Sequence, residues 1–397
     1  MIKKLFYKLK NLYLKRYFAV FMSNFKEYSY HSAGKNFKTR IIQADDFKGL
    51  RDKQILEFVK KVYFRHIKNN DSQNKEDMWD MHLKNVNRKL IEYLDSDQDK
   101  SAIDYLNNMF INGATTGFMT YGGYLYSQTT ANKNFNKNLA AFYMDSLVNL
   151  AEYLGVIPVE NVEQRVWETS LNSDPDEILD KIESKLGIRI SFPKFRNGMP
   201  SIKTRRGFFN NRDMYYIYIS IRIKDICKNI NQPSICEIGG GLGLLCYYLD
   251  MFGIKDFTSV DIISTSLFSS YFLMRNMEER QFADNFTADK TSIKILSPED
   301  FLNISGKKFD VLINCDSFPE IDKKTIIKYL EKIRESCDNF FSINQEASNV
   351  MYKNGPKQNI VHKLISELSP HNREFHNISR NLFWIRRGYV EELYEIK

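Results

Sequence analysis

The sequence of 397 residues has only five cysteines and nine prolines, and it contains no long apolar run. No two cysteines have the CxxC spacing of a zinc or redox site, so we expect reduced, mostly buried thiols. No stretch approaches the roughly 18–20 uninterrupted apolar residues of a membrane-spanning helix, and the N-terminus lacks the small-residue cleavage site of a signal peptide. These absences predict a cytoplasmic protein.

Apolar and aromatic residues are plentiful. Hydrophobic residues make up 43% of the sequence, with 29 Phe and 23 Tyr among them, so a substantial core can form without disulfide bonds or a structural metal. The chain is longer than the roughly 100–200 residues of an ordinary domain. Two domains are therefore expected.

Acidic residues are scarce at the N-terminus. Residues 1–40 hold ten lysines and arginines but a single acidic residue, Glu27, whereas the whole chain has a net charge of +8. The remainder is close to neutral, which argues against a nucleic-acid-binding surface. Apolar positions three and four apart within residues 2–22 predict a basic amphipathic helix. Residues 1–30 could contact the anionic inner face of a membrane, or the helix could dock on its own protein or on a partner.

Residues 41–206 have mainly helical periodicity and are predicted to form a helical domain. Its role would be acceptor recognition or oligomerisation, including assembly of a homo-oligomer. The clearest signal is Ser173-Asp174-Pro175, a capping residue and a first-turn proline that open a helix ending near Gly187. The other predicted helices are Gln54–Ile67, Asp77–Leu94 and Lys137–Leu154.

Residues 207–397 alternate short β-branched or aromatic runs with helical stretches, which predicts a parallel sheet with helices on both faces. The predicted strands are Ser234–Ile238, Phe257–Ile262, Ser292–Leu296, Phe309–Asn314, Asn339–Asn344, Leu382–Arg386 and Tyr389–Ile396. The predicted helices are Gly243–Phe252, Ser264–Arg280, Asp322–Cys337 and Gln358–Leu368. Only Arg387-Gly388 separates the last two strands, so they must form an antiparallel hairpin. A Rossmann-like α/β sheet that ends in an antiparallel strand is the architecture of class I methyltransferases.

The most specific segment is Glu237-x-Gly239-x-Gly241-x-Gly243, which follows an apolar strand and precedes a helix. Glycine is needed where the backbone turns sharply or approaches a ligand, and the helix N-terminus offers free N–H groups. A dinucleotide fingerprint starting at Gly239 would need glycine or alanine at position 244, which is leucine. The spacing therefore favours S-adenosylmethionine (SAM), while an NAD-binding oxidoreductase stays an alternative.

Two acidic positions follow the next strands. Asp261 ends the second strand, at about the distance onward where a nucleotide-binding sheet places an acid that binds both ribose hydroxyls. After the third strand, Glu299 or Asp300 could read the adenine amino group or cap the following helix. The predicted cofactor-binding residues are Glu237, Gly239, Gly241, Gly243, Asp261, Ile262, Glu299, Asp300 and Asn314.

The loops after strands four and five should face the transferred methyl group. Methyl transfer from a sulfonium requires mainly positioning, but a hydroxyl acceptor also needs a base. The candidates for that base are Asp316, Glu320, Glu346, His362, His371 and His376. By position we favour Glu346 and His362, then Asp316, although a carboxylate here could be structural and a histidine could be a surface residue. There is no tight Asp-Asp pair, so no metal is expected.

Several segments of the sequence together indicate a particular family of methyltransferases. They are Glu237–Gly243, a Tyr-rich helix with Tyr215, Tyr216, Tyr218 and Arg222, Asn314–Glu320, Ser342–Glu346 and the closing Gly388–Leu393. Over about residues 145–397 the chain resembles the sugar O-methyltransferases of bacterial surface-polysaccharide biosynthesis. The resemblance implies a class I SAM-dependent enzyme, a sugar hydroxyl as acceptor and a role in glycan decoration. A methyltransferase for another small molecule and an inactive scaffold stay alternatives.

Two features would suit such an acceptor. A basic cluster could bind a nucleotide-sugar phosphate or an acidic glycan, or it could simply be a solvated loop. Its members are Lys194, Arg196, Lys203, Arg205 and Arg206. Stacking on a sugar ring could come from Trp79, Trp167 or the Gly113–Gly123 segment.

Overall fold

The computed structural model describes residues 37–47, 51–68, 87–117, 133–161, 169–306, 308–321, 323–345, 374–386 and 388–397. The amphipathic helix predicted within residues 2–22 and the helix predicted at Gln358–Leu368 lie outside these ranges. Membrane contact through residues 1–30 therefore stays a prediction, which liposome binding can test. Within the described ranges, no helix is long and apolar enough to cross a membrane.

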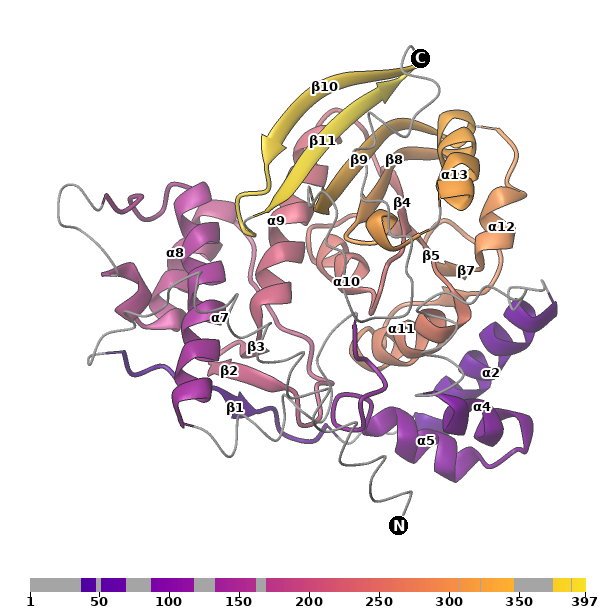
Figure 1. Cartoon of the computed structure of the whole chain (residues 1–397), viewed down its shortest axis with the longest axis horizontal. Coiled ribbons are helices and arrows are strands. Elements are labelled where there is room, and N and C mark those ends of the chain that lie inside the picture. The colour runs from indigo at the N-terminus through magenta and orange to yellow at the C-terminus, as the bar shows by residue number, and fades with distance from the viewer. Residues whose placement is uncertain are drawn as a thin grey trace, which may run out of the picture.

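An eight-stranded sheet forms the centre of the C-terminal half (Figure 1). Its strands are β4 (Ser234–Ile238), β5 (Asp256–Val260), β6 (Phe282–Ala283), β7 (Ile293–Leu296), β8 (Phe309–Cys315), β9 (Cys337–Gln345), β10 (Phe375–Leu382) and β11 (Tyr389–Ile396). They lie in the order β10-β11-β9-β8-β4-β5-β7-β6. Neighbouring strands are parallel, except that β11 is antiparallel to both β9 and β10. The sheet is Rossmann-like with an antiparallel strand near its edge, as predicted.

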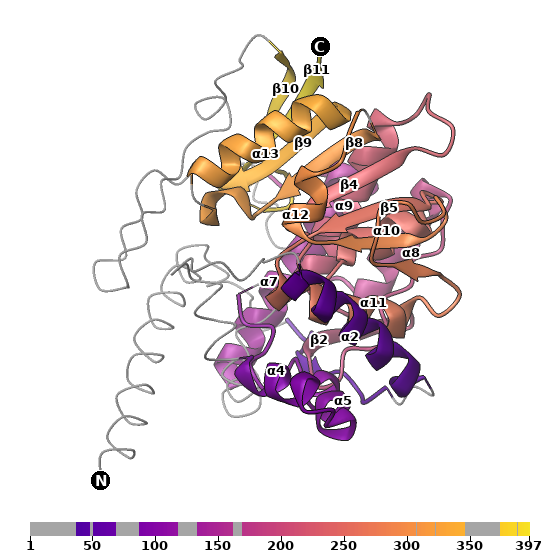
Figure 2. The same ribbon diagram turned by 90° about the vertical axis from the view of Figure 1, so that its right-hand side faces the viewer.

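Alternating side chains along the strands explain why helices cover both faces of the sheet. Val311 and Ile313 of β8 pack into one apolar cluster, whereas Leu312 between them packs into another. The first cluster includes α9 (Asn211–Ile226), α10 (Leu244–Met251) and α11 (Ile263–Asn276). The second includes α12 (Pro298–Leu302) and α13 (Lys323–Ser336). The sheet is thus enclosed between two helical layers (Figure 2).

The first half of the described chain is mainly helical, with a small antiparallel sheet. Its helices are α2 (Asp52–Lys68), α4 (Arg88–Asp95), α5 (Asp99–Asn107), α7 (Lys133–Tyr153) and α8 (Pro175–Leu186), and its strands are β1 (Ile42–Gln43), β2 (Pro200–Thr204) and β3 (Gly207–Phe209). Helix α2 lies against α11 and α7 lies against α9 (Figures 1 and 2). The hairpin β2–β3 spans the predicted domain boundary at residue 206. That boundary and the role of the helical half stay predictions.

Helix α8 has the predicted signals at both ends. The side chain of Asp174 accepts a hydrogen bond from the Asp176 N–H, and Pro175 occupies the first turn. Gly187 ends the helix in the left-handed conformation, with φ of 66°. The cap, the proline and the glycine each act locally, which is why the sequence alone placed this helix correctly.

One strand prediction is wrong. Residues 382–386 are apolar and aromatic, but β10 covers Phe375–Leu382 and pairs along its length with β11. The chain from Phe383 onward makes the turn, in which the Phe383 N–H donates to the Tyr389 carbonyl over 2.9 Å. Phe383 and Ile385 are buried beneath that turn, which explains their apolar character. The antiparallel hairpin itself is confirmed.

Candidate functional site

The glycine loop leaves β4 at Ile238 and enters α10 at Leu244. Gly239, Gly241 and Gly243 all have positive φ, of 77°, 56° and 85°, which other residues rarely adopt. A Cβ on Gly239 would lie 2.2 Å from the Ser317 Oγ, and a Cβ on Gly243 would lie 2.7 Å from a methyl carbon of Leu273. The loop therefore needs glycine both for its backbone shape and for its close packing.

Asp261 lies directly after β5 and reaches across to the glycine loop. Its Oδ2 accepts a hydrogen bond from the Gly241 N–H over 2.9 Å, and its Oδ1 accepts from the Ile262 N–H over 2.8 Å. Burial raises the pKa of Asp261 to about 7, although these backbone N–H groups oppose the shift. Strands β5 and β7 lie on one side of β4, and the next strand along the chain, β8, lies on its other side. The order of the strands therefore reverses at β4, and α/β sheets bind ligands at such a point.

Glu237 lies in β4 beneath the loop and is fully buried. Neither oxygen of its carboxylate has a hydrogen-bond partner among the described residues. Burial, reinforced by the charge of Asp261, raises the pKa of Glu237 to about 8. A buried carboxylate without a partner is costly, so its presence indicates that something else completes this site.

Asn314, the cofactor-binding candidate in β8, joins the strand ends together. Its amide nitrogen donates to the Ile238 carbonyl over 2.9 Å and to the Ser317 Oγ over 2.5 Å. Its carbonyl oxygen accepts from the Asn344 side chain over 3.0 Å. Asn314 is buried, and it ties the end of β4 to the segment after β8 and to the end of β9.

Asp316 follows β8 and adopts a left-handed backbone conformation, with φ of 62°. Its Oδ2 accepts from Arg386 over 2.8 Å and lies 3.4 Å from Arg212, and its Oδ1 accepts from the Tyr389 hydroxyl. Burial alone would raise the pKa of Asp316, but the charges of Arg386 and Arg212 and the Tyr389 hydrogen bond hold it below its usual value. Asp316 is therefore ionised at neutral pH, with both oxygens already bonded.

Sequence reasoning did not identify these partners of Asp316 as functional residues. Arg212 lies at the start of α9, Arg386 in the turn before β11, and Tyr389 at the first position of β11. Tyr389 pairs with Gln345, so the turn lies beside the end of β9. The Tyr-rich helix and the closing segment supported the family resemblance. Neither sequence pattern shows that the carboxylate of Asp316 contacts both segments.

The adenine-side candidates differ in their contacts. Ser297 and Asp300 form a reciprocal capping box at the start of α12, and Asp300 also pairs with Arg65 of α2 at 2.7 Å. Both contacts help to hold the pKa of Asp300 below its usual value, against the effect of burial. Glu299 is exposed. Of the two predicted roles for Asp300, capping is the one that the contacts display.

Several predicted site residues lie outside the described part of the chain. These are Glu346, His362, His371, Trp79, Trp167 and most of the Gly113–Gly123 segment, and the side chain of Glu320 is not described either. His376 was predicted to follow strand five in a loop, but it lies exposed in β10. The predicted base therefore stays a prediction.

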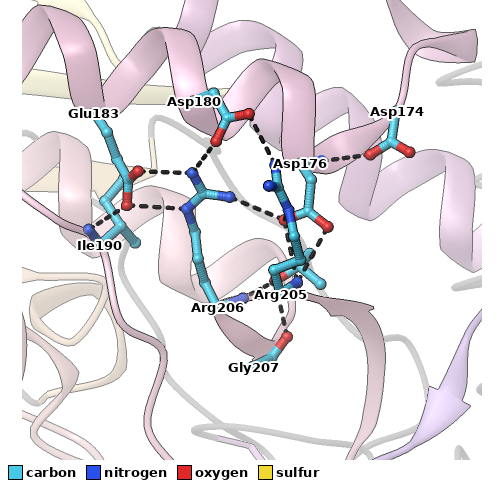
Figure 3. Close-up of polar contacts among 9 residues, drawn as sticks. Asp174, Asp176, Asp180, Glu183, Ile190, Arg205, Arg206 and Gly207 are labelled. Atoms are coloured by element: carbon cyan, nitrogen blue, oxygen red, sulfur yellow. Dashed lines mark hydrogen bonds and ion pairs between the residues drawn. The ribbon is translucent and has the colours of Figure 1, made fainter.

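The arginines of the basic cluster at residues 194–206 have partners within the protein. Arg196 is fully buried and pairs with Asp213 of α9, which is also buried. Arg206 pairs with Asp176 at 2.9 Å and with Glu183 at 2.6 Å on α8 (Figure 3). Arg205 pairs with Asp180 of the same helix at 2.8 Å. Acids of the protein already pair with these arginines, which disfavours the binding of a phosphate or an acidic glycan at this cluster; that binding stays a prediction.

Comparisons with known proteins give matches of fold alone. No protein-family model matches the sequence, and a search of curated proteins gives no match. The solved structures that are similar include magnesium protoporphyrin IX methyltransferase (ChlM) from Synechocystis PCC 6803 with bound SAM, at 15% identity over 47% of this chain and 83% of that chain, with a TM-score of 0.32. The glycopeptide N-methyltransferase MtfA complexed with sinefungin is similar at 13% identity over 46% of this chain and 94% of that chain, with a TM-score of 0.32. The order and directions of the strands, with β11 antiparallel beside β9, are those of the Rossmann-like class I methyltransferase fold.

Proposed function

We propose that this protein is a SAM-dependent methyltransferase. The observation that carries the proposal is the glycine loop flanked by Glu237, which is buried without a partner among the described residues, and by Asp261. A ligand that brings hydrogen-bond donors and positive charge would satisfy both carboxylates. SAM has ribose hydroxyls for Asp261 and carries an ammonium and a sulfonium beside its one carboxylate.

The two alternatives suit these residues less well. NAD would bring a pyrophosphate, whose negative charge cannot compensate Glu237 or Asp261 when they ionise, and Leu244 stands where the NAD fingerprint needs glycine or alanine. An inactive scaffold would gain nothing from a buried carboxylate such as Glu237, whose desolvation destabilises the fold. Both considerations favour an active SAM site.

The acceptor that we propose is a sugar hydroxyl in surface-polysaccharide or glycan biosynthesis. The family resemblance supports it, and the turn that carries Arg386 also exposes Trp384, whose side chain offers an aromatic surface to an acceptor ring. A hydroxyl must lose its proton, and Asp316 suits that role poorly because its pKa is lowered and its oxygens are bonded. Glu346 and His362 stay the proposed bases.

The acceptor can be tested with methyl-labelled SAM and a panel of nucleotide sugars, lipid-linked glycans, small phenols and peptides. We expect label in a sugar fraction. A general base contributes about 10²- to 10⁴-fold, so Glu346→Gln or His362→Ala should slow transfer by at least about 100-fold while S-adenosylhomocysteine (SAH) still binds. Label found only in phenols or peptides would rule out a sugar acceptor and leave a methyltransferase of another substrate.

Cofactor binding should depend on pH through the two carboxylates. Their pKa values, raised to about 7 for Asp261 and about 8 for Glu237, mean that the folded protein holds protons that the unfolded chain has released above about pH 4. Their contribution to stability is therefore present at low pH and is lost as pH rises through 7 to 8. A ligand that carries an ammonium binds best once they are ionised, so SAH affinity should rise several-fold from pH 6 to pH 8, as calorimetry would show.

The control for this pH dependence is Glu237→Gln, which removes one titrating group and keeps its shape. This variant should bind SAH more weakly at pH 8 and show a flatter pH profile. Its unliganded form should also lose less stability between pH 6 and pH 8.5, measured by thermal unfolding. An identical profile in both proteins would show that Glu237 does not titrate in this range.

A further inference from the structure

Two guanidinium groups share one carboxylate at the edge of the candidate site. Arg386 and Arg212 both approach the same oxygen, Oδ2 of Asp316, at 2.8 Å and 3.4 Å. The other oxygen accepts from the Tyr389 hydroxyl. The guanidinium of Arg386 also lies 3.9 Å from the centre of the Tyr389 ring, which fixes its plane. Arg212 and Arg386 together are the arginine pair, and Asp316 and Tyr389 are the residues that hold it.

The arginine pair carries an excess of one positive charge. Among the described residues, neither arginine pairs with a carboxylate other than Asp316. The charge of Arg386 opposes the positive charge on Arg212, so the two groups repel each other. Protein interiors and clefts seldom keep like charges together without a counter-ion, because the repulsion is poorly screened there. A bound anion would therefore compensate the remaining positive charge of the two guanidiniums.

Both arginine side chains of the pair are partly exposed. Their side chains are 20% and 31% exposed for Arg212 and Arg386, whereas the paired Arg196 is fully buried. Each guanidinium has five N–H donors in a planar fork, and Asp316 occupies only one nitrogen of each in the described contacts. The unused donors suit the paired oxygens of a carboxylate or a phosphate.

The arginine pair lies close to the glycine loop, at the end of the sheet where cofactor and acceptor would meet. Ser317, the residue after Asp316, packs so closely on Gly239 that a Cβ there would lie 2.2 Å from its Oγ. The pair therefore lies just beyond the carboxyl ends of β4 and β8, beside the loop that would hold SAM. Ligands of open α/β sheets bind outside the carboxyl ends of the strands, so an acceptor beside SAM would lie within reach of this pair.

We propose that Arg212 and Arg386 bind an anionic group of the methyl acceptor, a carboxylate or a phosphate, and that Asp316 holds the two guanidiniums in place. This inference rests on the proposed function and narrows its substrate class to acidic or phosphorylated sugars. A neutral sugar would bring no charge of its own to compensate the excess charge of the pair. Arg212 and Arg386 suit such a group better than the basic cluster at residues 194–206, whose arginines pair with acids of the protein.

Three probes that share one ring separate the possible charges: glucuronic acid, glucose 1-phosphate and glucose. We measure their binding to the SAH-loaded full chain by calorimetry. At least one charged sugar should bind about tenfold or more tightly than glucose. Preference for glucuronic acid would identify a carboxylate, and preference for glucose 1-phosphate would identify a phosphate; either supports the proposal. Equal affinity for all three would overturn it.

Variants that change the affinity for a charged sugar in opposite directions would exclude a merely structural role for the arginine pair. Arg212→Gln and Arg386→Gln should each weaken binding of the preferred charged sugar by about tenfold. Asp316→Asn keeps an oxygen that can accept from the guanidiniums but removes the negative charge that competes with the ligand, so it should instead strengthen binding of that sugar several-fold. Arg380→Gln is the matched control, since Arg380 lies in β10 of the same hairpin and pairs with Glu392 at 2.5 Å. This variant should bind the preferred charged sugar as tightly as the parent protein does.

The outcomes also separate this inference from the proposed function. SAH binding without a preference for charged sugars would leave the methyltransferase standing and overturn the role of the arginine pair. Failure of SAH binding would instead refute the proposed function. If Arg212→Gln and Arg386→Gln both left the affinity for the preferred charged sugar unchanged while melting temperatures stayed within a few degrees of the parent, these arginines would not contact the acceptor and the proposal would be wrong.

Discussion

Replacing Asp261 by alanine should weaken SAH binding by about 100-fold or more. Hydrogen bonds to a charged group contribute about 1.5–3 kcal/mol each, and a ribose offers two hydroxyls to this carboxylate. The variant also frees the N–H groups of Gly241 and Ile262, which Asp261 holds in the structure, so the glycine loop loses an anchor as well. Isothermal calorimetry with SAH measures the effect directly.

Two further variants make this result specific. Asp261→Asn keeps one acceptor oxygen, so its affinity should fall between those of the parent and the alanine variant. Asp256→Ala is the matched control, because Asp256 lies at the other end of β5 and pairs with Lys294 at 2.9 Å. Its affinity for SAH should match the parent. An unchanged affinity in Asp261→Ala would place the cofactor elsewhere, and tighter binding of NAD than of SAH would favour an oxidoreductase.

The sheet and its glycine loop could be predicted because their signals are local. β4 and β11 have the predicted bounds, and each rests on a run of apolar or β-branched residues beside a turn. The loop Gly239–Gly243 has a spacing that few backbone shapes require, and Asp261 follows it at a distance set by one βα unit. Such features depend on neighbours in the sequence, so one sequence is enough to predict them.

The roles of the arginines could not be predicted, because each depends on a partner far along the chain. Arg206 looked free in sequence, yet its partners Asp176, Asp180 and Glu183 lie on one face of α8, about 23 to 30 residues earlier (Figure 3). Arg386 was assigned to a strand, yet it lies in a turn and meets Asp316, 70 residues earlier. Charge in a sequence indicates potential contacts, and only the fold decides which of them are satisfied internally.

Arg196 and Asp213 illustrate this limit, and they predict the largest loss of stability. Both side chains are fully buried and paired, and Asp213 also accepts from the Asn210 N–H over 2.7 Å and from the Tyr248 hydroxyl over 2.6 Å. The carboxylate thus ties the segment before β2 to the start of α9 and to α10. Asp213→Ala would leave a buried guanidinium unpaired, so we expect the free energy of unfolding to fall by about 3–5 kcal/mol in urea titrations.

The double variant Arg196→Met, Asp213→Ala tests whether the unpaired charge causes that loss. Removing both partners leaves no buried charge, so the double variant should regain part of the stability that Asp213→Ala loses. Asp213→Asn should lose less than Asp213→Ala, because its amide oxygen can still accept from the Tyr248 hydroxyl or cap α9. A loss below about 1 kcal/mol in Asp213→Ala would mean that water reaches Arg196 and that the pair is less enclosed than its burial indicates.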